Sequence, residues 1–88
     1  YNADELVLIL KNLLKKSHYK IKREAFEWIS EYISSKVLTK DENFGNARFI
    51  RNTFEKMVQY QADRLARQND ISNDDLMIIT IDDVNKFK

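Results

Sequence analysis

The chain has no cysteine, one glycine and one histidine among its 88 residues. The lack of cysteine excludes disulfides and thiolate metal sites, and it is compatible with a reducing, cytoplasmic setting. The single glycine, Gly45, cannot supply the glycine-rich phosphate cradle of a P-loop. The single histidine, His18, argues against a protein-built zinc site, and no serine stands in a recognisable nucleophile motif. We therefore expect neither a metal site nor catalytic residues within this chain.

A charge excess and long apolar runs are also missing. Fifteen Lys and Arg residues against fourteen Asp and Glu residues leave a net charge of +1, so no bulk field favours nucleic acid. The longest apolar run, Leu6 to Leu10, is too short to span a bilayer, and no signal-peptide pattern is present. Hydrophobic residues make up 43% of the chain, enough for the core of one small domain. We expect neither nucleic acid nor a membrane as a partner.

Apolar residues recur at helical spacing along most of the chain, which predicts an all-α fold, a small bundle of about four helices. The first helix is expected to begin at a capping box, Asn2 to Glu5, and to end near Ser17. The others are expected over about 22–36, about 46–68 and, after an N-cap at Thr80, through Phe87. Residues 76–79 (Leu76 to Ile79) are short and apolar, and periodicity does not distinguish a strand from an extended core segment there. Residues 1–88 contain no repeat and are expected to form a single domain.

The third expected helix has two different sides. Its apolar stripe predicts core positions for Ala47, Ile50, Phe54, Met57, Val58 and Leu65. A separate polar strip recurs at three- and four-residue steps and contains Arg48, Arg51, Asn52, Glu55 and Gln59.

Four other side chains carry expectations of their own. Trp28 follows the period of the second helix, which predicts a core position. Leu8 lies off the apolar arc of the first helix, so it should be partly exposed. Asp82 and Asp83 stand at the start of the last helix, where acidic residues are most often capping residues.

The segment from Phe44 to Asn52 is the most informative one. Gly45 suits a sharp entry into a helix, and Asn46 suits its N-cap. Arg48 then falls in the first turn, where free N–H groups and the helix dipole favour an anion. A cation is unfavourable there unless a negative group pairs with it. A guanidinium is well shaped for this, because its planar fork can donate two hydrogen bonds to phosphate oxygens. The local chemistry suggests a phosphate sensor, while a solvated surface arginine is the plainer alternative.

These residues resemble a known family. The series Gly45-Asn46-Ala47-Arg48-Phe49-Ile50-Arg51-Asn52, then Phe54-Glu55-Lys56, then Gln61-Ala62-Asp63-Arg64-Leu65, resembles the C-terminal helical lid of AAA+ ATPases of the CbbX/CfqX type. That group includes the stage V sporulation protein K relatives and the ATPases of type VII secretion systems. The beginning of the chain, Tyr1 to Leu6, and the segment from Ile79 to Val84 are similar to the family's opening and closing elements. The resemblance therefore spans the whole chain.

The resemblance implies a function. Arg48 matches the family's sensor-2 arginine, which reads the γ-phosphate of ATP, bound with Mg²⁺ in the preceding core domain, and couples hydrolysis to rotation of the lid on a hinge near Tyr1. Gly45, Asn46, Arg51 and Asn52 are the candidate supporting residues. The implied partners are the chain's own AAA+ core, adjacent subunits of a ring, expected to be a hexamer, and a protein substrate.

The chain begins at Tyr1 rather than at a methionine, so we expect a fragment or a processed product. In the family, the Walker motifs belong to the core that would precede Tyr1. The fragment alone is therefore expected not to hydrolyse ATP.

Two alternatives from other classes stay open. One is a stand-alone helical module, arranged like a histone fold, that binds protein or DNA without nucleotide. The other is a structural helical domain with no ligand site. The near-neutral net charge and the unopposed Arg48 weigh against the first of these.

Overall fold

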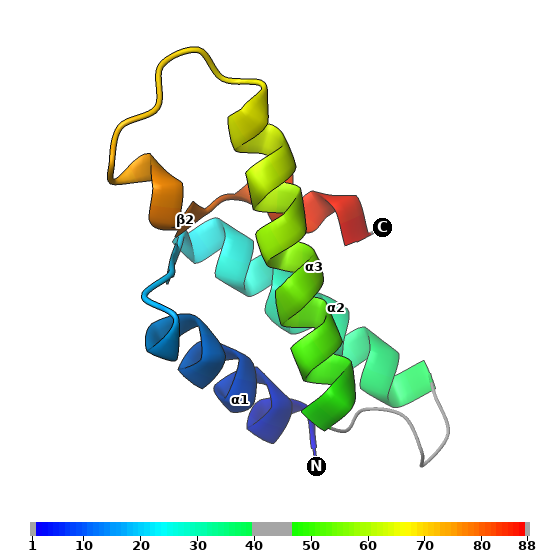
Figure 1. The fold of residues 1–88 in the computed structure, drawn as a ribbon. Coiled ribbons are helices and arrows are strands. Elements are labelled where there is room, and N and C mark those ends of the chain that lie inside the picture. The colour runs from blue at the N-terminus through cyan, green and yellow to red at the C-terminus, as the bar shows by residue number, and fades with distance from the viewer. Residues whose placement is uncertain (1, 40–46, 88) are drawn as a thin grey trace.

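The helices account for most of residues 2–39 and 47–87, which are the residues that the computed structural model describes. The α-helices within this part are α1 (Ala3–Lys16), α2 (Arg23–Thr39), α3 (Ala47–Ala66) and the short α4 (Ile81–Val84). Two 3₁₀ turns, η1 (Asp75–Met77) and η2 (Asn85–Phe87), and two short strands, β1 (Lys20–Ile21) and β2 (Ile78–Ile79), complete the described elements. The prediction of a small all-α bundle is confirmed (Figure 1).

Both ends of α1 are set by local motifs. At its start, Asn2 Oδ1 accepts a hydrogen bond from the Glu5 N–H at 2.9 Å, and the Glu5 carboxylate accepts one from the Asn2 N–H at 3.0 Å. This is the predicted capping box. At its end, the Tyr19 N–H donates to the Leu14 carbonyl at 2.8 Å, and the His18 N–H donates to the Lys15 carbonyl at 3.1 Å. This pair of bonds is a Schellman motif, which closes the helix where the sequence predicts.

His18 takes the left-handed position of that motif, with a φ of 66°. Glycine is the usual residue there, because the left-handed conformation costs a residue with a Cβ roughly 1–2 kcal/mol. The side chain of His18 is exposed. The turn directs the chain out of α1 and into β1.

The two strands join distant parts of the chain. β1 and β2 pair in parallel, with Lys20 opposite Ile78 and Ile21 opposite Ile79. The Lys22 N–H extends the pairing by donating to the Ile79 carbonyl at 2.9 Å. This result settles the open segment near Leu76–Ile79, which is a 3₁₀ turn followed by a strand. The strand in the first connection was not predicted, because a two-residue strand has no periodicity and its partner lies far along the chain.

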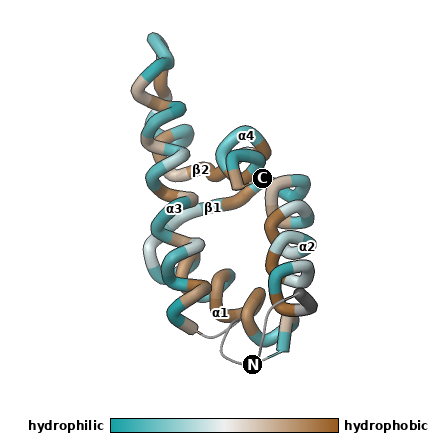
Figure 2. The backbone as a smooth tube through the Cα atoms, turned by 90° about the vertical axis from the view of Figure 1, so that its right-hand side faces the viewer, coloured by the Kyte–Doolittle hydropathy of each residue, from teal (hydrophilic) through white to brown (hydrophobic). Residues whose placement is uncertain are grey.

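The core lies where α1, α2 and α3 meet and is closed by β2 and α4. α1 packs against both α2 and α3, and α4 packs against the same two helices. Hydrophobic residues, brown in Figure 2, recur along α1 and α2. The buried cluster consists of Leu6, Leu10, Leu14, Ala25, Ile29, Ile33, Ile50, Met57, Ile79 and Val84. Leu8 is 57% exposed, as predicted.

Some details of the helix predictions are wrong. α2 continues past the expected end at residue 36, and α3 ends two residues earlier than expected. Ala47 was predicted to be core but is exposed, because it is the first residue of α3, where neighbouring elements cover fewer sides of a helix. Phe54 and Val58 are half-buried rather than fully buried. Trp28 is also half-buried and packs on the rim of the core instead of inside it.

Replacing His18 with glycine should stabilise the domain. Glycine removes the left-handed penalty but gains freedom in the unfolded chain, so we expect the free energy of unfolding to rise by about 0.5–1 kcal/mol. Chemical denaturation measures this change. Ser17→Gly is the matched control, because Ser17 has a φ of −92° and gains nothing from glycine. Equal effects of the two substitutions would show that the left-handed turn carries no strain.

Candidate functional site

Arg48 lies in the first turn of α3, and its side chain is exposed. The first turn of α3 contains no acidic residue. Within residues 2–39 and 47–87, Arg48 forms no hydrogen bond and no ion pair. Its guanidinium therefore stands at the positive end of a 20-residue helix without a compensating charge from the described part of the chain. Such a group is well placed to meet an anion that approaches from outside.

The rest of the predicted polar strip follows along the same helix. Arg51 and Asn52 lie one turn after Arg48, and both are exposed, as are Glu55 and Gln59. Asn52 shares a shallow hollow of about 290 Å³ with the next turns of the strip, lined by Asn52, Glu55, Lys56 and Gln59. The prediction of a separate polar side of α3 is therefore confirmed. Whether Arg51 and Asn52 support Arg48 stays a prediction.

Gly45 and Asn46 lie outside the described residues. Their expected roles, as the entry to α3 and as its N-cap, stay predictions from the sequence.

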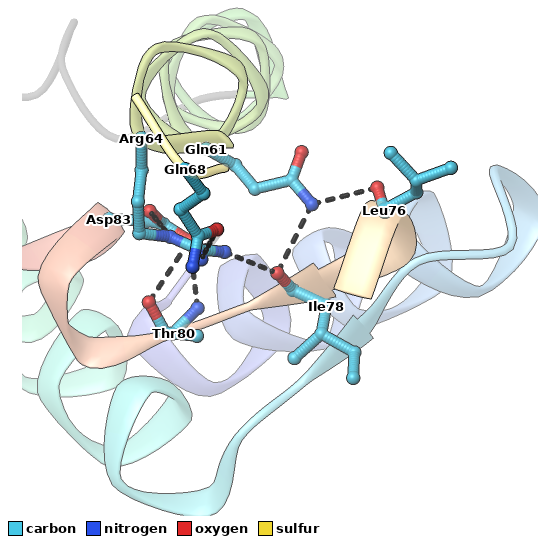
Figure 3. Close-up of polar contacts among 7 residues, drawn as sticks. All are labelled: Gln61, Arg64, Gln68, Leu76, Ile78, Thr80 and Asp83. Atoms are coloured by element: carbon cyan, nitrogen blue, oxygen red, sulfur yellow. Dashed lines mark hydrogen bonds and ion pairs between the residues drawn. The ribbon is translucent and has the colours of Figure 1, made fainter. Parts of the chain in front are cut away.

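A polar cluster at the other end of α3 was not predicted. Arg64 Nε donates to Asp83 Oδ1 at 2.8 Å, and its Nη2 donates to Asp83 Oδ2 at 3.3 Å. The Asp83 side chain is fully buried, whereas the Arg64 side chain keeps 20% of its surface exposed. The same carboxylate accepts a 2.9 Å hydrogen bond from the Thr80 N–H at the start of α4. Asp83 thus caps α4, as predicted, and also joins α4 to α3 (Figure 3).

Backbone carbonyls near β2 complete this cluster. Arg64 Nη2 donates to the Ile78 carbonyl at 3.2 Å. Gln61, which is 2% exposed, donates to the carbonyls of Leu76 and Ile78 at 2.9 and 3.1 Å. Figure 3 shows both side chains reaching from α3 toward this segment. Two side chains of one helix therefore hold β2 and the turn before it.

One signal for this cluster was present in the sequence. Gln61 stands four residues after Met57 and four before Leu65, so it occupies a buried row of the helix. A polar residue in such a row needs hydrogen-bond partners, because burying an unpaired amide is costly. The identity of the partners depends on the tertiary fold and was not readable.

Two other kinds of feature, a metal site and a membrane-spanning helix, are absent from the described residues. Among residues 2–39 and 47–87, no group of three or more histidine or acidic side chains is placed to hold a metal ion. None of the helices in this part of the chain combines the length and the hydrophobicity needed to cross a membrane.

Comparison with known proteins identifies the class of this domain. The sequence model of the AAA lid domain family matches residues 2–88. The chain therefore belongs to the AAA lid domain family.

Named relatives agree with this assignment. The chain is 33% identical over 87 residues to "Stage V sporulation protein K" of Bacillus subtilis (strain 168), covering 97% of this chain and 27% of that protein. It is 31% identical over 90 residues to "Protein CfxQ homolog" of Guillardia theta, covering 100% of this chain and 30% of that protein. A protein of the same description from Pyropia yezoensis is also 31% identical, with 29% of its length covered. The chain thus spans under a third of the length of these relatives.

Removing the charge of Asp83 should destabilise the domain strongly. Asp83→Asn leaves Arg64 without its counter-charge in a largely buried place, and we expect a loss of roughly 3 kcal/mol in the free energy of unfolding. This figure is at the low end for buried pairs, because the Arg64 side chain keeps 20% exposure. Thermal or chemical denaturation measures the loss.

Asp82→Asn is the control, since Asp82 is the exposed neighbour in the same turn. Its effect should stay within about 0.5 kcal/mol. Similar losses for both variants would mean that the first-turn charge, and not the ion pair, stabilises this end of the fold.

Proposed function

We propose that this domain is the C-terminal lid of an AAA+ ATPase and that Arg48 is its sensor-2 residue. In this proposal, ATP is bound with Mg²⁺ in a core domain of the same protein, and Arg48 contacts its γ-phosphate. Loss of the γ-phosphate releases the contact and lets the lid rotate relative to the core. Membership of the AAA lid domain family supports the class, and the environment of Arg48 supports the residue.

The assignment depends on one observation: Arg48 at the start of α3 is exposed and has no counter-charge among the described residues. A surface arginine usually lies where solvent or a carboxylate satisfies it, and the helix dipole makes the first turn an unfavourable place for it. A phosphate group removes that disadvantage, because it pairs with the guanidinium and with the dipole at once. Arg51, one turn later, is farther from the free N–H groups of the helix start and is the weaker candidate.

The position of Arg48 in the fold also suits this role. In both views, the start of α1 and the start of α3 lie at the same end of the molecule (Figures 1 and 2). A core domain joined ahead of α1 would therefore lie close to Arg48. The hinge just before α1 and the phosphate contact at the start of α3 would then lie at the same end of the lid.

The packing of α3 lets a pull on Arg48 move the whole lid. Ile50 and Met57 of α3 are fully buried in the core that α1 and α2 share. The ion pair of Arg64 with Asp83 fastens the far end of the same helix to α4. Arg48 and Arg64 are 16 positions apart, about 24 Å along the helix axis at 1.5 Å per residue. A force at one end is therefore transmitted through a continuous packed body.

The wider setting belongs to the same proposal. We expect the parent protein to form a ring, most simply a hexamer, in the cytoplasm and to remodel a protein substrate. Rotation of one lid would be transmitted to the adjacent subunit and so couple nucleotide state to the assembly.

Replacing Arg48 with alanine in the full-length ATPase tests the proposal. ATP turnover should fall by about 10- to 1000-fold, the range found when charges that stabilise a transferring phosphoryl group are removed. The lid should stay folded, because Arg48 is exposed and surface substitutions usually change stability by less than about 0.5 kcal/mol. Arg48→Lys should restore activity only in part, because an ammonium keeps the charge but loses the planar fork.

Arg51→Ala is the matched control on the same strip, since it removes the same charge one turn farther along. Parental turnover in Arg48→Ala, or a larger loss in Arg51→Ala, would show that the sensor has been assigned to the wrong residue.

A further inference from the structure

Four aromatic rings from α2, α3 and η2 form a continuous ladder. Trp28 stacks on Tyr32 with ring centroids 5.7 Å apart and an interplanar angle of 13°. Tyr32 meets Phe87 of η2 at 5.2 Å, and Phe87 meets Tyr60 of α3 edge-on at 5.2 Å. All four rings are only half-buried, although each packs beside the core. We call Trp28, Tyr32, Phe87 and Tyr60 the aromatic ladder.

Two adjoining hollows lie along the aromatic ladder. The larger has a volume of about 400 Å³ and is lined by Trp28, Glu31, Tyr32, Ser35, Lys36 and Phe87. The smaller, of about 250 Å³, shares Tyr32, Lys36 and Phe87 with it and adds Phe49, Asn52, Thr53 and Lys56. Because they share three residues, the hollows form one groove across α2, η2 and α3. Grooves lined by aromatic rings with a few polar groups are typical binding sites.

Among the described residues in and beside the groove, lysines outnumber carboxylates. Lys36 Nζ lies 5.5 Å from the centre of the Tyr32 ring, and Lys86 Nζ lies 5.8 Å from that of Tyr60. Lys56 lines the smaller hollow. Among the described residues that line the two hollows, Glu31 is the one carboxylate. Lysines above aromatic faces keep their charge at the rim while the rings supply the apolar surface.

The composition of this face is that of a protein-binding surface. Tryptophan and tyrosine are enriched among the interface residues that contribute most of the binding energy. Such residues lie in pockets surrounded by polar groups. Trp28 and Phe87 are not part of the buried cluster but pack on its rim, so the core is buried without this face being covered. The excess of lysine selects the charge of the occupant.

We propose that the groove docks an acidic peptide segment of a partner protein, with one bulky apolar side chain flanked by carboxylates. The apolar side chain enters the larger hollow and covers Trp28 and Tyr32. The flanking carboxylates meet Lys56, which lines the smaller hollow, and Lys86, which lies over the Tyr60 ring. This interaction does not use Arg48, and its test does not require an active ATPase.

The chain contains its own reporter for the test. Trp28 is its only tryptophan, so a change in intrinsic fluorescence reports events in the groove. The probe is the synthetic peptide Asp-Glu-Leu-Asp-Glu, added to the 88-residue chain. We expect saturable binding that shifts the Trp28 emission, and amide chemical-shift changes confined to α2 from Trp28 to Lys36, α3 from Phe49 to Tyr60, and η2. Binding should weaken as salt is raised from about 0.1 to about 1 M, which shortens the Debye length from about 10 to about 3 Å.

Charge reversal supplies the matched variants. Lys56→Glu combined with Lys86→Glu should weaken binding at least about tenfold, because both positions are exposed and both would then repel the peptide. Lys15→Glu combined with Lys22→Glu makes the same change of net charge at exposed positions elsewhere and should leave binding within about twofold. Phe87→Ser tests the apolar part, with circular dichroism as the check on folding.

Peptide controls separate the two parts of the recognition. Asn-Gln-Leu-Asn-Gln lacks the carboxylates, Asp-Glu-Ser-Asp-Glu lacks the apolar side chain, and each should bind at least about tenfold more weakly. Absence of saturable binding, equal binding by all three peptides, or shift changes centred elsewhere would overturn the proposal. Concentration-dependent association of the chain without peptide, abolished by the Lys56 and Lys86 changes, would show that the groove binds a second copy instead and would also overturn it.

Discussion

Asp83 is a carboxylate with no exposed surface in a small domain, and its pairing with Arg64 is the interaction on which the arrangement of the fold depends. A buried charge without a partner is strongly unfavourable, so the chain adopts this fold only if α3 brings Arg64 to that place. The pair joins the last turn of α3 to the start of α4, and Arg64 and Gln61 also bind the carbonyls that precede α4. The segment after α3 contains only short elements, and it is held by contacts with α3, with α2 and with β1.

This arrangement gives α3 two different ends. Near its last turn, the guanidinium of Arg64 is paired inside the domain, whereas the guanidinium of Arg48 at its first turn is exposed and has no partner among the described residues. The same chemical group is structural in one place and available for an external anion in the other. Because the buried face of α3 lies in the shared core, the exposed end is attached to a rigid body. The phosphate contact that we propose for Arg48 would therefore orient the whole domain.

The sequence predicted the helices well because their signals are local. The capping box at Asn2, the exposure of Leu8 and the polar strip from Arg48 to Gln59 all follow from spacing within one helix. The parallel pairing of Lys20 with Ile78 and the ion pair of Arg64 with Asp83 join residues far apart in the chain, and no local pattern reports them. Trp28 shows the same limit. Its spacing gives the correct side of α2, but its depth depends on how far Phe87 and Tyr32 cover it.

The most direct test of the central claim measures the position of the lid in the full-length protein. A spin label at Arg67→Cys, an exposed position beyond the end of α3, and a second label on the ATPase core report the distance between lid and core. We expect different distance distributions with a non-hydrolysable ATP analogue and with ADP. In Arg48→Ala, we expect a single distribution for both nucleotides. If Arg48→Ala still distinguishes the two nucleotides as the parent does, Arg48 does not read the γ-phosphate.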